Sequence, residues 1–96
     1  MPVIARISKS AMTLGDAPVG FVGRIEAIRV TGGEHDLPSG EIERRLIELG
    51  FVEGARVKIL QEGLFGRDPI AVRVNDATVA LRRREAASIL VEPEPG

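Results

Sequence analysis

The stretch from Arg44 to Pro93 decides the fold of this chain, and it reads RRLIELGFVEGARVKILQEGLFGRDPIAVRVNDATVALRRREAASILVEP. Its hydrophobic spacing changes once along its length. At the start, apolar residues recur about every four positions, as in a helix, and from Ala55 onward they alternate with polar residues, as in strands. The stretch therefore predicts a short helix, a glycine stop, a hairpin, another strand, an arginine-rich turn and a last strand.

The expected helix begins near Ser39, whose hydroxyl is a candidate N-cap. Ile42, Leu46 and Leu49 follow at i, i+4 and i+7 and form a single apolar stripe. Gly50 then ends the helix, because glycine adopts the left-handed cap conformation at little cost. A helix of two to three turns is not stable alone, so we expect it to lie against a sheet.

Two strands with period-two alternation follow, the first from Ala55 to Leu60 and the second from Ile70 to Val74. The glycine-containing segment Gln61 to Pro69 is expected to be the loop that joins them into a hairpin. Asn75-Asp76-Ala77 is a predicted tight turn, because both polar side chains can bond to nearby backbone. Thr78 to Leu81 is the next strand.

Three further elements complete the predicted fold. Phe21 to Val30 is the first strand, with a bulge or strong bend near Gly23 because its apolar residues do not alternate cleanly. Arg82 to Ala87 indicates one helical turn, and Ile89 to Val91 is the final strand.

About five short strands and one helix are too few for a two-sheet sandwich with its own core. We therefore predict a mainly β fold, a small SH3-like β-barrel of about five strands. One short α-helix covers an open end, and a further helical turn precedes the last strand. A five-stranded OB-type barrel is the alternative. The expected divisions are an N-terminal extension (1–13), the barrel domain (14–93) and a C-terminal tail (94–96).

The composition of the 96 residues narrows the possible functions. Without cysteine there is no disulfide, thiolate metal site or cysteine nucleophile. Thirteen basic and fourteen acidic residues give a net charge of −1, and their interleaving argues against a wide polyanion-binding surface. The N-terminal residues lack the apolar run of a signal peptide or membrane span, so we expect a cytoplasmic protein.

Four motifs in a fixed order give the chain a resemblance to a known family. They are Leu14 through Gly20 with Gly23 to Ile25, then Arg45 to Gly54, Gly66-Arg67-Asp68-Pro69-Ile70, and Leu81 to Ala86. This arrangement resembles the ferrous iron transport protein A (FeoA) family, over about Leu14 to Glu92. Arg67 is a one-residue departure from the family pattern and could lengthen the hairpin loop.

The resemblance implies a non-enzymatic accessory or regulatory protein of bacterial ferrous iron uptake. Its partner would be the cytoplasmic side of a FeoB-type transporter with a GTPase domain, which would place it peripherally at the inner membrane without inserting. A metal-responsive or anion-binding module is the alternative, and self-association through an exposed strand edge is a third possibility.

The residues themselves also argue against catalysis. The chain has no phosphate-cradling G-x-x-x-x-G-K-[S/T] loop, because neither Lys9 nor Lys58 follows a glycine. Nucleic-acid binding is not expected either, since the chain has no Trp or Tyr and only Phe21, Phe51 and Phe65 on which bases could stack.

Leu64 and Phe65 are the first candidate for partner binding, because large apolar residues flanked by glycines are unusual in a loop. Alternatively, Phe65 folds back onto the barrel. Arg82, Arg83 and Arg84 are the second candidate and could meet an anionic partner, although such a run is often a solvated turn paired with nearby carboxylates.

Glu34, His35 and Asp36 are the candidate metal ligands, since imidazole and carboxylates suit Fe(II) and other divalent ions such as Mn(II). Three consecutive side chains rarely converge on one ion, however. A solvated polar loop is therefore the competing interpretation, and any iron bound there would be held weakly, so no cofactor is expected.

Overall fold

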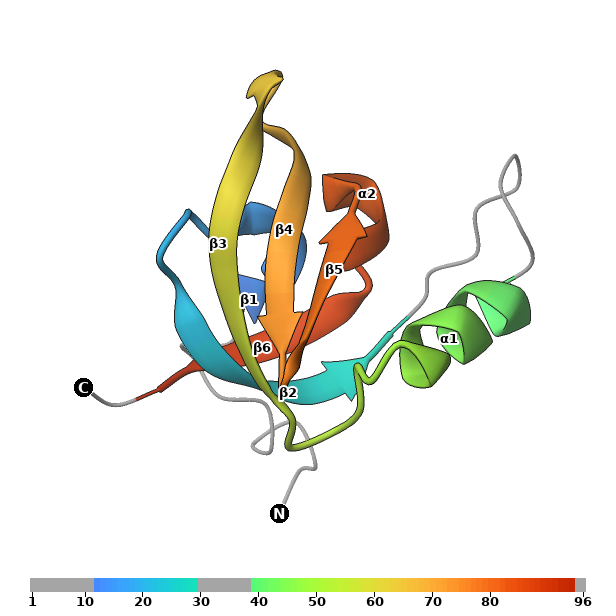
Figure 1. The fold of residues 1–96 in the computed structure, drawn as a ribbon. Helices are drawn as coiled ribbons and strands as arrows, with labels where there is room; N and C mark the ends of the chain where they lie inside the picture. The colour runs from blue at the N-terminus through green and yellow to red at the C-terminus, as the bar shows by residue number, and fades with distance from the viewer. Residues whose placement is uncertain (1–11, 30–38, 95–96) are drawn as a thin grey trace.

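The computed structural model describes residues 12–29 and 39–94 (Figure 1). Within them, six strands form one antiparallel sheet in the order β1-β6-β2-β3-β4-β5. The strands are β1 (Met12–Thr13), β2 (Val22–Ile28), β3 (Arg56–Phe65), β4 (Asp68–Val74), β5 (Ala77–Leu81) and β6 (Ile89–Pro93). The helices are a 3-10 turn, η2 (Leu14–Asp16), and two α-helices, α1 (Ser39–Glu48) and α2 (Arg83–Ala86). The prediction of a mainly β fold with a helical turn before the last strand is confirmed.

The sheet curls around one apolar core. Figure 1 shows β2 and β6 crossing below the long β3–β4 hairpin. Alternate residues of the hairpin point inward, so that Val57 lies opposite Val74 and Ile59 opposite Val72, all four at most 2% exposed. The core is completed by Leu14, Ala17, Ile25, Leu46, Phe51, Ala55, Ile70, Leu81, Ala86, Ile89 and Val91.

Irregularities in the strands let a single sheet bend this sharply. The register of β2 against β6 shifts between Ile25 and Ala27, so the predicted bulge exists but lies beyond Gly23. β3 shifts register against β4 twice, between Ile59 and Gln61 and again between Glu62 and Phe65. Each shift adds a residue to one strand, which increases local twist and curls the sheet.

Helix α1 begins at Ser39, and whether the hydroxyl of Ser39 caps it stays a prediction. Leu46 is its one buried side chain among residues 41–48, whereas Ile42 is half-buried. Gly50 ends the helix with a φ of 105°, and Phe51 behind it is fully buried. Figure 1 shows α1 beside the barrel, so Leu46 and Phe51 anchor a largely exposed helix.

The hairpin differs most from expectation. The segment Gln61 to Pro69 is not a loop, because β3 runs to Phe65 and β4 begins at Asp68. Only Gly66 and Arg67 connect the strands, so Arg67 does not lengthen the loop. Glycine and proline made this segment look irregular, but pairing between the two strands carries the ladder through it.

The N-terminal start of the sheet also differs from the predicted start of the barrel domain at residue 14. Met12 and Thr13 pair with Val91 and Leu90 of β6, so the sheet includes two residues that the sequence assigned to an extension. No helix in residues 12–29 or 39–94 has both the length and the apolar character needed to span a bilayer.

Candidate functional site: the β3–β4 tip and its arginine clamp

The tip of the β3–β4 hairpin carries the most exposed large apolar side chains in the part of the chain that the structure describes. Leu64 is 93% exposed and Phe65 88%, whereas the next most exposed, Val19 and Ile47, are each at 46%. Phe65 therefore does not fold back onto the barrel. We call Leu64, Phe65, Gly66 and Arg67 the hairpin tip.

The turn at the tip has an unusual backbone. Gly66 and Arg67 both have positive φ values, 69° and 60°, the combination found in the two-residue turns that match the twist of a hairpin. At the base of the tip, a Cβ on Gly63 would overlap the Asp68 carbonyl of the opposite strand. Glycine at position 63 thus lets the strands approach closely below the two exposed apolar residues.

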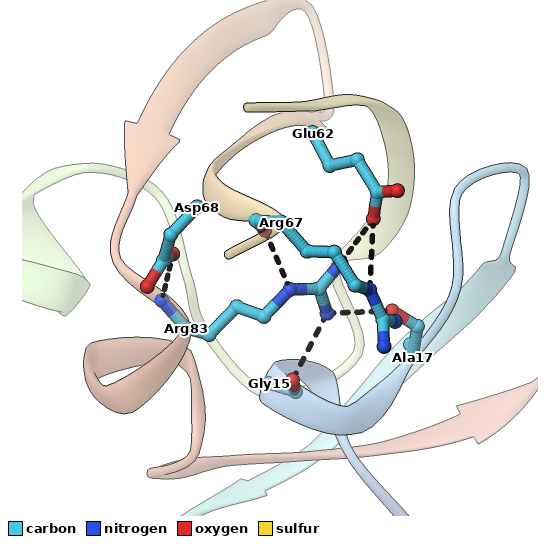
Figure 2. Close-up of polar contacts among 6 residues, drawn as sticks. All are labelled: Gly15, Ala17, Glu62, Arg67, Asp68 and Arg83. Atoms are coloured by element: carbon cyan, nitrogen blue, oxygen red, sulfur yellow. Dashed lines mark hydrogen bonds and ion pairs between the residues drawn. The ribbon is translucent and has the colours of Figure 1, made fainter. Parts of the chain in front are cut away.

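Arg83 clamps the tip end of this hairpin to the rest of the barrel, as Figure 2 shows. Its Nε donates to the carbonyl of Arg67 at 2.8 Å, and its Nη1 donates to the carbonyls of Gly15 at 3.0 Å and Ala17 at 2.9 Å. Its Nη2 forms an ion pair with Glu62 Oε1 at 2.8 Å. One guanidinium therefore joins α2, the turn around η2 and both sides of the hairpin tip.

Two carboxylates complete the clamp. Asp68 Oδ1 accepts from the backbone N–H of Arg83 at 2.8 Å, which satisfies a free amide in the first turn of α2. Glu62 Oε1 also accepts from Arg67 Nε at 3.3 Å. The Arg83 side chain is only 15% exposed, so these bonds hold a mostly buried cation.

The three consecutive arginines thus have different environments. Arg83 is committed to contacts within the protein, while Arg82 and Arg84 are exposed. The backbone N–H of Arg82 donates to Glu85 Oε1 at 3.0 Å, and Glu85 also pairs with Arg45 at 3.4 Å. Partner binding by Arg82 and Arg84 stays a prediction, and they lie at the α2 end of the clamp.

The candidate metal ligands Glu34, His35 and Asp36 lie outside the described residues. Within residues 12–29 and 39–94, no group of three His, Asp or Glu side chains is placed to hold a metal ion. Metal binding through Glu34, His35 and Asp36 therefore stays a prediction.

Sequence reasoning found the tip but missed the clamp. Glu62 and Asp68 lie in the segment Gln61 to Pro69, which the sequence predicts to be a loop, so their pairing with Arg83 was not predicted. One signal was available: Asp68 and Arg83 fall within two of the four ordered motifs, although nothing in the sequence indicates that these motifs touch.

The structure is thus a small antiparallel β-barrel with an exposed apolar hairpin tip, which the hydrogen bonds and the ion pair of Arg83 tie to the rest of the barrel. The chain belongs to the FeoA family, because the FeoA domain model matches residues 12–93. This family consists of small accessory SH3-like domains and is not a known family of enzymes.

Solved FeoA structures have the same fold. FeoA of Stenotrophomonas maltophilia, an SH3-domain protein complexed with zinc, is 34% identical with a TM-score of 0.68, over 84% of this chain and 89% of that one. FeoA of Chlorobium tepidum is 30% identical with a TM-score of 0.72, over 88% of this chain and 72% of that one. The prediction of an SH3-like fold in the FeoA family is thereby confirmed.

A relative from Porphyromonas gingivalis is a fusion of an Fe(2+) transport protein A with the Fe(2+) transporter FeoB. It is 42% identical over 53 residues, which are 55% of this chain. The match spans only 6% of that much longer protein.

Proposed function

We propose that this protein is a non-enzymatic accessory protein of ferrous iron transport. It binds the cytoplasmic side of a FeoB-type transporter that carries a GTPase domain, and it makes this contact through the hairpin tip. The fused relative supports the choice of partner, because a transport protein A segment and a FeoB transporter in one polypeptide are held close together. Nothing in this role requires the protein itself to bind a metal.

The exposure of Leu64 and Phe65 carries the proposal. Both side chains are almost wholly in water, at 93% and 88% exposed, and they are adjacent at the end of β3. Moving one such side chain fully into an apolar pocket contributes about 1.5–3 kcal/mol. A partner that covered both would gain binding energy that no other described pair of neighbours offers.

The clamp by Arg83 strengthens this contact. A flexible loop would lose conformational freedom on binding, whereas a tip already fixed in place loses little. Arg83 bonds to the carbonyl of Arg67 in the turn and to Glu62 just before the tip, so the chain is held on both sides of the two apolar residues. The tip therefore enters its partner as a rigid projection.

The shape of the tip defines the pocket that would receive it. Leu64 and Phe65 are consecutive at the end of β3, where the register shifts before Phe65. Because consecutive side chains of a strand point to opposite faces, we expect the two to project from the two sides of the hairpin. A flat surface could bury only one of them. The binding site on the transporter is therefore expected to be a slot that encloses the hairpin from both sides.

The test is direct binding of the purified full chain to the detergent-solubilised FeoB-type transporter of the same organism, with and without GTP. Leu64→Ala and Phe65→Ala should each weaken binding about 30-fold, which corresponds to a loss of about 2 kcal/mol. Ile47→Ala is the matched control, because Ile47 is an exposed apolar residue on α1, away from the tip. It should bind like the unmodified protein.

Two results would contradict the proposal. Absence of binding in every nucleotide state, with the protein folded, would exclude a direct complex of these two components. Binding that survives both tip substitutions would place the contact elsewhere on the barrel.

A further inference from the structure

The outer face of the sheet carries a cluster of basic side chains at the end of the hairpin opposite the tip. The strand register places Arg24 of β2 opposite Arg56 of β3, and Lys58 of β3 opposite Arg73 of β4. All four are exposed, and the hairpin residues between them, such as Val57, point into the core. We call Arg24, Arg56, Lys58 and Arg73 the basic face.

Like charges directly opposite each other across two strands destabilise a sheet. Arg24 and Arg56 have this repulsion relieved, because Arg24 Nη1 donates to the Gly54 carbonyl at 3.0 Å and Arg56 Nε pairs with Glu94 at 2.8 Å. For the side chains of Lys58 and Arg73 the described part of the structure holds no hydrogen bond or ion pair. Within residues 12–29 and 39–94, two cations thus face each other without forming an ion pair, in a chain whose net charge is −1.

A hollow lies over this pair. It has a volume of about 300 Å³ and is lined by Arg56, Val57, Lys58, Arg73, Asn75 and Asp76. The hollow offers ammonium, guanidinium and amide groups, and Asp76 is its one acidic side chain. An anion seated here would relieve the repulsion between Lys58 and Arg73 and could accept charge-assisted hydrogen bonds from both.

The form of the basic face indicates the kind of anion. Arg24 lies opposite Glu92 of β6 and Arg56 pairs with Glu94, so the unpaired charge of the face is that of Lys58 and Arg73 on two neighbouring strands. Two cations side by side on neighbouring strands suit adjacent carboxylates of one segment better than a single phosphate group. The hollow contains no aromatic side chain on which a nucleotide base could stack. We infer that the basic face is a second docking surface, which binds an acidic segment of a partner protein.

This surface is separate from the hairpin tip. β3 has ten residues and spans roughly 30 Å, with the basic face at its start and the tip at its end. The inference does not depend on what the tip binds, because it rests on the strand register, on the unpaired side chains of Lys58 and Arg73 and on the hollow over them.

The experiment is a calorimetric titration of the full chain with hexaglutamate at low and high NaCl, with amide chemical shifts recorded in parallel. Hexaglutamate should bind at low salt and weaken as screening increases. The shifts should concentrate at residues 56–58 and 73–76. The double variant Lys58→Gln, Arg73→Gln should lose at least about tenfold in affinity. The control Arg29→Gln, Arg44→Gln removes the same charge from exposed sites elsewhere and should bind normally.

A second measurement tests the unpaired charges without any ligand. Lys58→Glu places opposite charges across the strands, so it should raise the melting temperature by a few degrees relative to Lys58→Gln. Equal melting temperatures would show that Lys58 and Arg73 do not interact, and would remove the basis of the inference.

Three further outcomes would overturn the proposal. The first is equal loss of hexaglutamate binding in the control double variant, which would mean non-specific attraction. The second is binding of inorganic phosphate at these residues without hexaglutamate binding, which would mean a small-anion site. The third is binding to phosphatidylserine vesicles but not to hexaglutamate, lost in the Lys58→Gln, Arg73→Gln variant, which would mean a membrane-facing surface.

Discussion

Arg83 Nη2 and Glu62 Oε1 lie 2.8 Å apart, although the two residues are 21 positions apart in the chain. This ion pair joins the start of α2 to the hairpin just below its exposed tip. Because Arg83 also bonds to the carbonyls of Gly15, Ala17 and Arg67, one side chain ties the tip end of the hairpin to the turn around η2.

Replacing Arg83 by Met should lower the free energy of unfolding by about 2–3 kcal/mol, since it removes charge-assisted bonds and leaves buried carbonyls without donors. Arg83→Lys should restore only part of this loss, because an ammonium group lacks the planar fork of a guanidinium. Urea denaturation would measure both, with Arg44→Met as the control at an exposed arginine on α1. A loss below about 0.5 kcal/mol for Arg83→Met would contradict the clamp.

Two phenylalanines should respond in opposite ways to truncation. Phe51 is fully buried behind α1, so Phe51→Ala should cost about 3–5 kcal/mol of stability. Phe65 is 88% exposed, so Phe65→Ala should change stability by no more than about 0.5 kcal/mol. Thermal or chemical denaturation of the two variants and of the unmodified protein measures both losses of stability. A large loss for Phe65→Ala would mean that Phe65 packs on the barrel in solution.

Gly63→Ala should destabilise the hairpin by about 1–3 kcal/mol, because the added methyl group would overlap backbone of the opposite strand. Amide shifts should change at Asp68 and across the tip. Gly54→Ala is the control: Gly54 has a φ of 88° and open space around it, so it should lose about 1 kcal/mol with no change at Asp68. An unchanged Asp68 amide in Gly63→Ala would show that the strands are not in close contact there.

Anaerobic titration with Fe(II) or Mn(II) should show weak binding without fixed stoichiometry. The physical reason is that three consecutive side chains, Glu34, His35 and Asp36, seldom point at one ion. Stoichiometric binding that His35→Ala abolishes would contradict this expectation and would favour a metal-responsive role.

Much of the fold could be predicted because it depends on local patterns. The stripe of Ile42 and Leu46 predicted α1, and the alternation of Val72 and Val74 predicted β4. The hairpin tip was predicted from its composition, but its shape was not. Glycine and proline lowered the strand propensity of Gln61 to Pro69, and only the opposite strand, with two register shifts, made that segment regular.

The sequence by itself determined the order of helix and strands, the glycine stop at Gly50 and the Asn75-Asp76 turn, because each depends on neighbouring residues. Only the tertiary structure decided that Arg83 is a clamp, since its partners come together when the sheet curls. The tertiary structure also decided that the four basic side chains of the basic face lie together. Charges that alternate with apolar residues along the chain look dispersed, but alternate residues of a strand share one face, so Lys58 and Arg73 meet only in the folded sheet.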